Sequence, residues 1–129
     1  MANSNEDLLR RGYDAFAVGD LQTLREIMDP DVVWHVPGRN PLAGDYRGID
    51  AVLDYFGRSM EHLQGTLRVV PQDVLANDER GVVVQHTTAQ RNGRSLDDVG
   101  VALFTIRNGK AVEVWQFWAD PYTADEVLS

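Results

Sequence analysis

The chain has 129 residues and no cysteine, 43% of its residues are hydrophobic, and 20 acidic side chains stand against 12 basic ones. This composition is typical of one soluble domain, and the net charge of −8 disfavours nucleic acids and anionic membrane surfaces as partners. Disulfides and thiolate chemistry are excluded, no apolar run could span a membrane, and the acidic start does not resemble a secretory signal, so we expect a cytoplasmic protein.

Two helices are expected at the N-terminal end. Between Glu6 and Val18, apolar residues recur at helical spacing, which predicts a first helix. Gly19 ends this helix, and Asp20 can cap a second, shorter one through its side chain. Pro30 is expected to end the second helix, because proline does not continue a helix.

A short strand and a third helix are expected next. The β-branched and aromatic residues of Val32–Val36 predict a strand, and the Pro- and Gly-rich segment Pro37–Gly44 predicts a loop. The third helix is expected over about Ile49–Leu63. Its apolar stripe contains Ile49, Val52, Leu53, Phe56, Met60 and Leu63.

After Gly65 the hydrophobic period changes to two, which predicts strands. They are expected near Thr66–Ala76, Val82–Arg91, Arg94–Arg107 and Lys110–Ala119. Asn-Gly pairs at 92–93 and 108–109 join the last three, because a type I′ turn needs two residues with positive φ. We therefore expect one α+β domain over residues 1–129, in which three N-terminal helices pack over the concave face of a curved antiparallel sheet. The interior of this cone is the natural ligand site.

Five segments, in this order, carry a resemblance to a known superfamily. They are Tyr13–Asp20 (YDAFAVGD), Val33–Gly38 (VWHVPG), Tyr46–Val52 (YRGIDAV), Arg91–Arg94 (RNGR) and Asn108–Asp120 (NGKAVEVWQFWAD). Over nearly its whole length the chain resembles the nuclear transport factor 2-like superfamily, which includes ketosteroid isomerases, SnoaL-like polyketide cyclases and limonene epoxide hydrolases. The resemblance implies the cone-shaped fold. The reaction has to be argued from the site, because this fold hosts unrelated chemistries.

The resemblance also allows each family chemistry to be compared with the residues present. Ketosteroid isomerases use an aspartate base and an oxyanion hole of a tyrosine and a protonated aspartate. The corresponding acid positions hold Val36 and Ala102, and only Tyr13 lies near its place, so that mechanism is not expected. SnoaL-like cyclases place an acid/base residue just beyond the last strand, where this chain has Asp120. An epoxide hydrolase relay through Asp98 and Asp120 would need an inward-facing arginine between them, and we find none.

Strand alternation, phased on the isomerase-like register, separates inward-facing from outward-facing side chains. A slip of one residue would exchange the two sets. The inward set is Val32, Trp34, Val36, Val83, Gln85, Thr87, Ala89, Asp98, Gly100, Ala102, Phe104, Val114, Gln116 and Trp118. The outward set includes His35, His86, Trp115 and Phe117. Because the outward aromatic residues would form an exposed apolar patch, we expect a homodimer through the outer face of the sheet.

Three residues are candidates for catalysis. Asp120 would be the acid/base if burial against aromatic side chains raises its pKa; the alternative is a strand-end Asp that caps a turn or helix at 121–127. Asp98 and Tyr13 could orient or polarise the substrate; the alternatives are a solvated hairpin acid and a tyrosine at the edge of the core. The candidate substrate-binding residues are Trp34, Phe56, Gln85, Thr87, Phe104, Gln116 and Trp118.

Together with the resemblance, these residues predict a small, cofactor-free enzyme of the isomerase, cyclase or hydrolase type that performs acid/base chemistry on a hydrophobic, cyclic carbonyl compound. No metal site is expected, because His35 and His86 face outward and no third ligand is suitably spaced. Two alternatives remain. The cone could bind a ligand without chemistry, or it could be filled by side chains in a domain that serves dimerisation.

Overall fold

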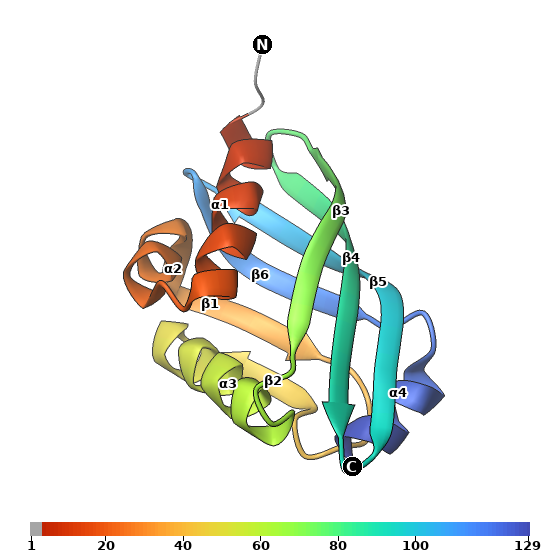
Figure 1. Ribbon diagram of the computed structural model, residues 1–129. Helices are drawn as coiled ribbons and strands as arrows, with labels where there is room; N and C mark the ends of the chain where they lie inside the picture. Colours follow the sequence, from red (N-terminus) through yellow and green to blue (C-terminus); the bar gives the residue numbers. More distant parts are fainter. Residues whose placement is uncertain (1–3) are drawn as a thin grey trace.

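A curved sheet of six strands and four helices make up residues 4–129, the part of the chain that the computed structural model describes (Figure 1). Residues 1–3 of the expected domain lie outside this range. The elements are α1 (Ser4–Val18), α2 (Leu21–Ile27), β1 (Met28–Val36), β2 (Gly44–Arg47), α3 (Ile49–His62), β3 (Arg68–Ala76), β4 (Arg80–Arg91), β5 (Arg94–Arg107), β6 (Lys110–Phe117) and α4 (Pro121–Leu128). The expected α+β cone is confirmed.

The last four strands form the expected antiparallel meander, in the sheet order β2-β1-β6-β5-β4-β3. Both Asn-Gly pairs are hairpin turns with positive φ at both residues: 52° and 78° at Asn92 and Gly93, 52° and 72° at Asn108 and Gly109. This conformation is the one that a two-residue type I′ turn requires. The two turns fix the register of β4, β5 and β6, and therefore decide which side chains face the cone.

The first two strands differ from the expectation. β1 begins at Met28, so Pro30 lies inside a strand and does not mark the end of a helix. β1 pairs in parallel with β6, and its register shifts between Met28 and Val33, the kind of irregularity at which a strand tolerates proline. The segment Gly44–Arg47, of which Gly44 was expected in a loop, forms the edge strand β2. The sheet is therefore mixed, with one parallel pair in an otherwise antiparallel arrangement.

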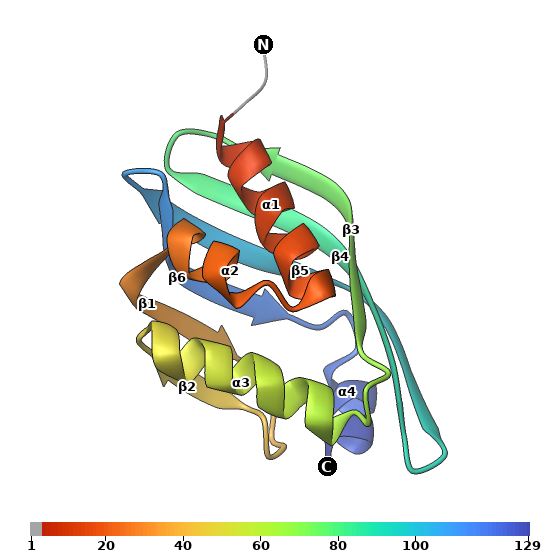
Figure 2. The same cartoon turned by 60° about the vertical axis from the view of Figure 1, so that its left-hand side comes forward.

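The helices α1, α2 and α3 lie across the concave face of the sheet (Figures 1 and 2). The Asp20 side chain caps α2 as predicted, by accepting a 3.1 Å hydrogen bond from the Thr23 amide. Helix α1 packs on β3 and β4, α3 packs on β1 and β2, and α4 packs near one end of the cone against β4 and β5. None of the helices within residues 4–129 is long and apolar enough to cross a bilayer.

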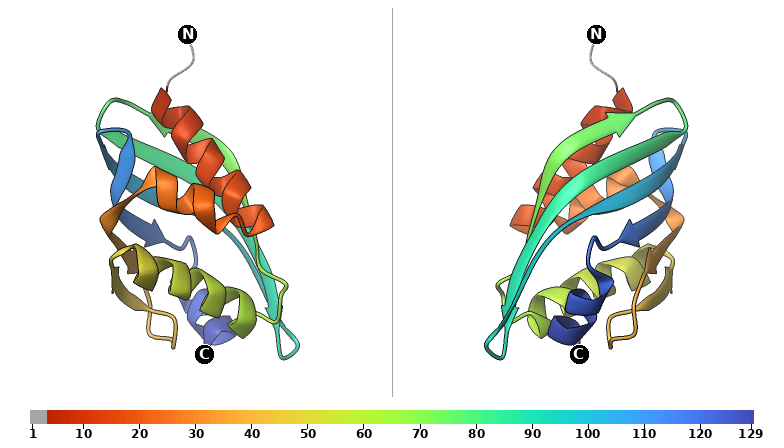
Figure 3. Two further views of the ribbon diagram at one scale, coloured as in Figure 1. Left: turned by 90° about the vertical axis from the view of Figure 1, so that its left-hand side faces the viewer. Right: turned by 90° about the vertical axis from the view of Figure 1, so that its right-hand side faces the viewer.

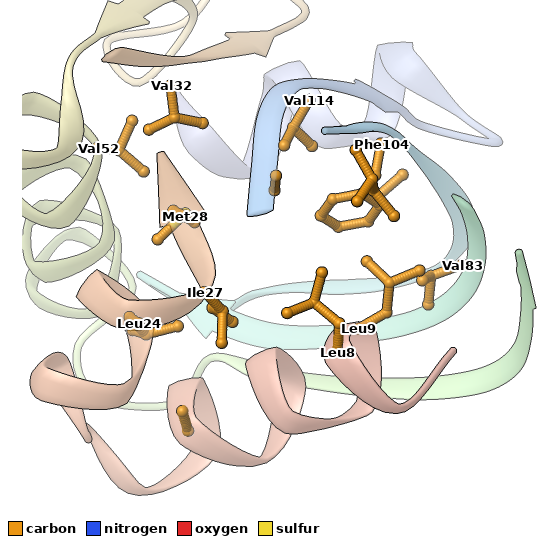
Figure 4. Close-up of a cluster of buried hydrophobic side chains, with 14 of the residues drawn as sticks. Leu8, Leu9, Leu24, Ile27, Met28, Val32, Val52, Val83, Phe104 and Val114 are labelled. Atoms are coloured by element: carbon orange, nitrogen blue, oxygen red, sulfur yellow. The ribbon is translucent and has the colours of Figure 1, made fainter. Parts of the chain in front are cut away.

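Two clusters of buried apolar side chains fill the space between helices and sheet. Figure 4 shows the first, in which Leu9 and Ile27 from the helices face Val83, Phe104 and Val114 from the sheet. The second cluster lies toward α4 and includes Tyr55, Leu63, Leu96, Val127 and Leu128.

Burial follows the predicted alternation. Along β4, Gln85 and Thr87 are buried, whereas the residue that precedes each of them, Val84 or His86, is partly exposed. The same two-residue pattern runs along β5. On the outer side, no helix among the described residues covers strands β3 to β5 (Figure 3). The inward and outward sets therefore have the predicted phase.

Candidate functional site

A cavity of about 120 Å³ lies inside the cone, between the helices and the inner face of the sheet. An apolar protein cavity of roughly 150 Å³ accepts a benzene-sized ligand, so this space is comparable to a single-ring compound. Eight of the ten residues singled out from the sequence line it: Tyr13, Trp34, Phe56, Gln85, Thr87, Phe104, Gln116 and Trp118. The two aspartates, Asp98 and Asp120, do not.

Aromatic rings form a continuous part of the cavity wall around Trp34. The indole meets Phe56 edge-to-face, with ring centroids 5.0 Å apart at 89°, and meets Phe104 at 6.1 Å and 89°. Phe16 contacts Phe56 at 5.2 Å, and Tyr13 contacts Phe104 at 6.4 Å. Edge-to-face packing of this kind stabilises both rings and holds them in place. The wall is therefore apolar and held by mutual contacts.

Gln116 is the first of two amide side chains in this wall. The Trp34 indole N–H donates to Gln116 Oε1, and the Tyr55 hydroxyl donates to the same oxygen at 3.2 Å. Burial raises the pKa of Tyr55, so its hydroxyl stays protonated at neutral pH. The amide nitrogen of Gln116 has no hydrogen-bond partner within residues 4–129.

Gln85 is the second amide, and it is held by α1. The Tyr13 hydroxyl donates to Gln85 Oε1 at 2.5 Å, and burial raises the pKa of Tyr13. Neither Gln85 Nε2 nor the Thr87 hydroxyl has a partner in the described part of the chain. The indole N–H of Trp118 is buried and also lacks an acceptor there. The polar part of the wall therefore offers mainly hydrogen-bond donors.

Asp98 faces inward as expected, but it serves the backbone. Its side chain is 4% exposed, and its two oxygens accept the amide N–H groups of Ala119 at 3.1 Å and Asp120 at 2.9 Å. A Cβ atom on Gly100 would lie 2.3 Å from the carbonyl oxygen of Phe117, so glycine is needed where the chain leaving β6 crosses β5. Asp98 is thus neither a cavity residue nor the solvated hairpin acid.

The expectation for Asp120 is wrong. The residue is exposed and caps α4, because its carboxylate accepts hydrogen bonds from the Thr123 amide at 3.1 Å and the Thr123 hydroxyl at 2.7 Å. These bonds favour the charged form and lower the pKa of Asp120, opposite to the rise that an acid/base role needs. Asp120 is instead the capping aspartate that the sequence analysis gave as the alternative.

Tyr55 and Ser59 are cavity residues that the sequence pattern missed. Both are buried on α3, and the Ser59 hydroxyl donates to the Tyr55 carbonyl at 2.8 Å. They lie next to the apolar stripe, at a spacing of four residues from each other, so their shared face could have been predicted. What no local pattern shows is that Tyr55 reaches Gln116 on the opposite layer.

The histidines of the outer face are not arranged as ligands. His35 Nδ1 lies 2.6 Å from an Asp45 oxygen, its Nε2 lies 2.8 Å from a Glu113 oxygen, and its ring stacks on Trp115 with centroids 3.7 Å apart. A neutral imidazole has one donor nitrogen, so two carboxylate partners require the imidazolium. Within residues 4–129, no three His, Asp or Glu side chains are placed to hold a metal ion.

The arrangement as a whole suits binding and polarisation of a neutral molecule. No cavity-lining side chain is a carboxylate, a histidine or a basic group, so the wall contains no side chain that would carry charge at neutral pH. Amide donors in an apolar wall can stabilise negative charge that develops on a bound oxygen. No carboxylate lines this site, so none is available there to abstract a proton from a substrate.

Comparison with known proteins identifies relatives along most of the chain. Residues 9–114 match the SnoaL-like domain family. An uncharacterized protein of Mycobacterium tuberculosis is 40% identical over 116 residues, which cover 89% of this chain and 88% of the relative.

Solved structures show the same fold. Bal32a, from a soil-derived mobile gene cassette, superposes with a TM-score of 0.93 at 36% identity over 98% of this chain and 97% of its own. An NTF2-like protein from Burkholderia xenovorans has a TM-score of 0.84 at 23% identity, with coverages of 98% and 96%. IdmH from Streptomyces antibioticus, a proposed polyketide cyclase, has a TM-score of 0.73 at 22% identity, with coverages of 88% and 90%.

Proposed function

The chain belongs to the SnoaL-like domain family, and on this basis we propose that its cone binds a small, hydrophobic, cyclic carbonyl compound and promotes its cyclisation or isomerisation. The observation that carries the proposal is the cavity wall. Aromatic and aliphatic side chains surround a few amide groups whose N–H atoms have no partner within the described residues. Apolar cavities with a few directed polar groups are typical of sites for such ligands.

The proposed rate enhancement comes from positioning and from hydrogen-bond donation. A cavity that holds a flexible substrate in a folded shape brings its reacting atoms together and removes much of the entropic barrier. Amide donors such as those of Gln85 and Gln116 would stabilise the enolate-like oxygen that forms when a carbonyl compound loses a proton from carbon. The wall supplies no carboxylate base, so the substrates that suit this site have a C–H acidic enough for a bound water molecule, or a basic atom of the substrate itself, to accept its proton.

Binding without chemistry is the second candidate. It is favoured by one observation, that no cavity-lining side chain is charged at neutral pH. Saturable binding of cyclic ketones without any product, measured for wild-type protein over hours, would support this candidate over the first.

A cavity-blocking substitution tests the proposal in both forms. Val69 lines the cavity from β3, whereas Val70, the next residue, is 54% exposed on the opposite face. We expect Val69→Trp to weaken binding of a cyclic ketone by about tenfold or more, because the indole would occupy space that the ligand needs. Val70→Trp is the matched control and should bind as wild type does. Equal affinities for both variants and the wild type would place the ligand elsewhere and overturn the proposal.

We also propose a homodimer through the outer face of the sheet. Val99, Trp115 and Phe117 are 45%, 43% and 49% exposed there, and an apolar patch of this kind marks an interaction surface. A sedimentation mass of twice the 14.4 kDa of one chain would support the dimer, and a mass of one chain would overturn it.

A further inference from the structure

The orientation of the Gln116 side chain is determined by its partners. An indole N–H can only donate a hydrogen bond, so the amide atom that faces Trp34 must be the oxygen. The Tyr55 hydroxyl points at the same oxygen from α3, at 3.2 Å. Both lone pairs of Gln116 Oε1 are therefore occupied, and a turned amide would lose the bond from Trp34 and place its NH₂ group against the indole N–H.

This arrangement leaves the nitrogen of Gln116 for the cavity. Gln116 lines the cavity, and its Nε2 has no partner within residues 4–129. An amide NH₂ group carries two donors and no acceptor. The atom that Gln116 presents to a bound molecule is thus a pure donor.

The rest of the wall adds to this excess of donors. Gln85 Oε1 already accepts the Tyr13 hydroxyl, and the buried indole N–H of Trp118 has no acceptor in the described part of the chain. The remaining acceptors in the wall are hydroxyl oxygens such as that of Thr87. A ligand that brings another donor therefore enters a wall in which the carboxamide oxygens are already occupied.

We propose that Gln116 determines ligand specificity, so that the cone prefers compounds with an acceptor oxygen, such as ketones and quinones, over the corresponding alcohols. This inference rests on the proposed function. A ketone oxygen accepts the Gln116 N–H and has no hydrogen of its own to satisfy. An alcohol also accepts this bond, but its O–H meets no free carboxamide oxygen and has only a hydroxyl oxygen, such as that of Thr87, as an acceptor in the wall. We expect this poorer match to lower affinity by about tenfold.

Three ligands of one shape test this inference. Calorimetric dissociation constants of the wild-type protein would be compared for cyclohexanone, cyclohexanol and cyclohexane, which share one ring. We expect the ketone to bind about tenfold more tightly than the alcohol. Equal affinities for ketone and alcohol, with cyclohexane also bound, would overturn the inference and leave the proposed function standing. If none of the three binds, the proposed function fails and the inference fails with it.

A substitution at Gln116 gives a second, independent measurement. Gln116→Glu keeps the oxygen that faces Trp34 and Tyr55 and replaces the free NH₂ group by an oxygen, which accepts when the side chain is ionised. At pH 8 we expect the preference to reverse toward cyclohexanol. Gln90→Glu is the matched control, because Gln90 is exposed on β4 and the substitution adds the same charge. A thermal unfolding curve would establish that each variant folds, and a Gln116→Glu variant that keeps the wild-type preference would overturn the inference.

Discussion

Two pairs of polar residues on or just beyond one sheet, all four selected from the sequence as site residues, have different hydrogen-bond partners. The glutamines Gln85 and Gln116 keep an N–H group without a partner in the described chain, and both line the cavity. The aspartates lie beyond the cavity, where both oxygens of Asp98 accept backbone N–H groups and both oxygens of Asp120 accept from Thr123. The glutamines are thus available to a ligand, and the aspartates are committed to the fold.

The contrast between the glutamines and the aspartates shows that an inward-facing position is not sufficient for a functional role. Asp98 is buried and inward, and a carboxylate in a cone invites a catalytic interpretation. What decides the role is the hydrogen-bonding capacity that the fold leaves unused. Three substitutions test whether this unused capacity decides the role of each residue.

The largest effect is expected from Asp98→Asn. The amide can present one oxygen, so one of the N–H groups of Ala119 and Asp120 would face an NH₂ group and lose its acceptor. Loss of a charge-assisted, buried hydrogen bond should lower the free energy of unfolding by about 2–3 kcal/mol, measured by urea denaturation. Affinity for a cyclic ketone should stay within about twofold, by analogy with residues outside the site. A variant as stable as wild type but without activity would return Asp98 to the catalytic site.

A smaller effect, visible as pH dependence, is expected from His35 on the outer face. Burial alone would lower the pKa of His35, but the hydrogen bonds and charges of Glu113 and Asp45 outweigh it and raise the pKa. A raised pKa in the folded state means that the stabilisation is fully present below the unfolded value near ~6.5 and is lost as pH rises through the folded value. The free energy of unfolding should therefore fall more steeply above about pH 6.5 in the wild type than in His35→Gln.

His86 offers the matched control for this measurement. It has one carboxylate partner, Asp97, at 2.6 Å, and its side chain is 35% exposed, compared with 11% for His35. His86→Gln should keep the part of the pH dependence that His35 contributes. If the free energy of unfolding depends on pH equally in His35→Gln and in the wild type, Asp45 and Glu113 do not hold an imidazolium. Hydrogen-bond commitment of carboxylates to the fold would then be a feature of the inner face alone.

The smallest effect is expected from Asp120→Ala. The substitution removes an exposed helix cap, so the melting temperature should fall slightly and less than in Asp98→Asn. Turnover and ligand affinity should be unchanged, because the carboxylate lies outside the cavity. A hundredfold loss of turnover, the usual cost of removing a general acid or base, would contradict the placement of this residue.

Much of the fold follows from local patterns in the sequence. The two Asn-Gly turns set the register from β4 to β6, and the two-residue period then places Gln85, Thr87 and Gln116 on the inner face. The Asp20 cap of α2 follows from its position just ahead of an apolar helical run. These features are predictable because the interactions that produce them span few residues.

The unpredicted features depend on residues that are far apart in the sequence. The cap at Asp120 and the backbone partners of Asp98 depend on where the chain goes after β6, which no period along β5 or β6 encodes. Tyr55 contributes to the site because its side chain reaches from α3 to Gln116 on β6, 61 residues further along the chain. The parallel pairing of β1 with β6 could not be predicted for the same reason, because the two strands are far apart in the sequence.

The parallel pairing of β1 with β6 has a consequence for how the chain reaches its native state. Trp34 pairs with Val114, 80 residues later, so β1 keeps an unpaired edge until the last strand has been synthesised. Contacts at such long sequence separation slow folding, since a long loop must close before they form. The meander of β3, β4 and β5 can assemble early, whereas the cavity is complete only when β6 inserts between β5 and β1 and brings Gln116 to Trp34. A nascent chain therefore cannot complete its cavity before its last strand has been made.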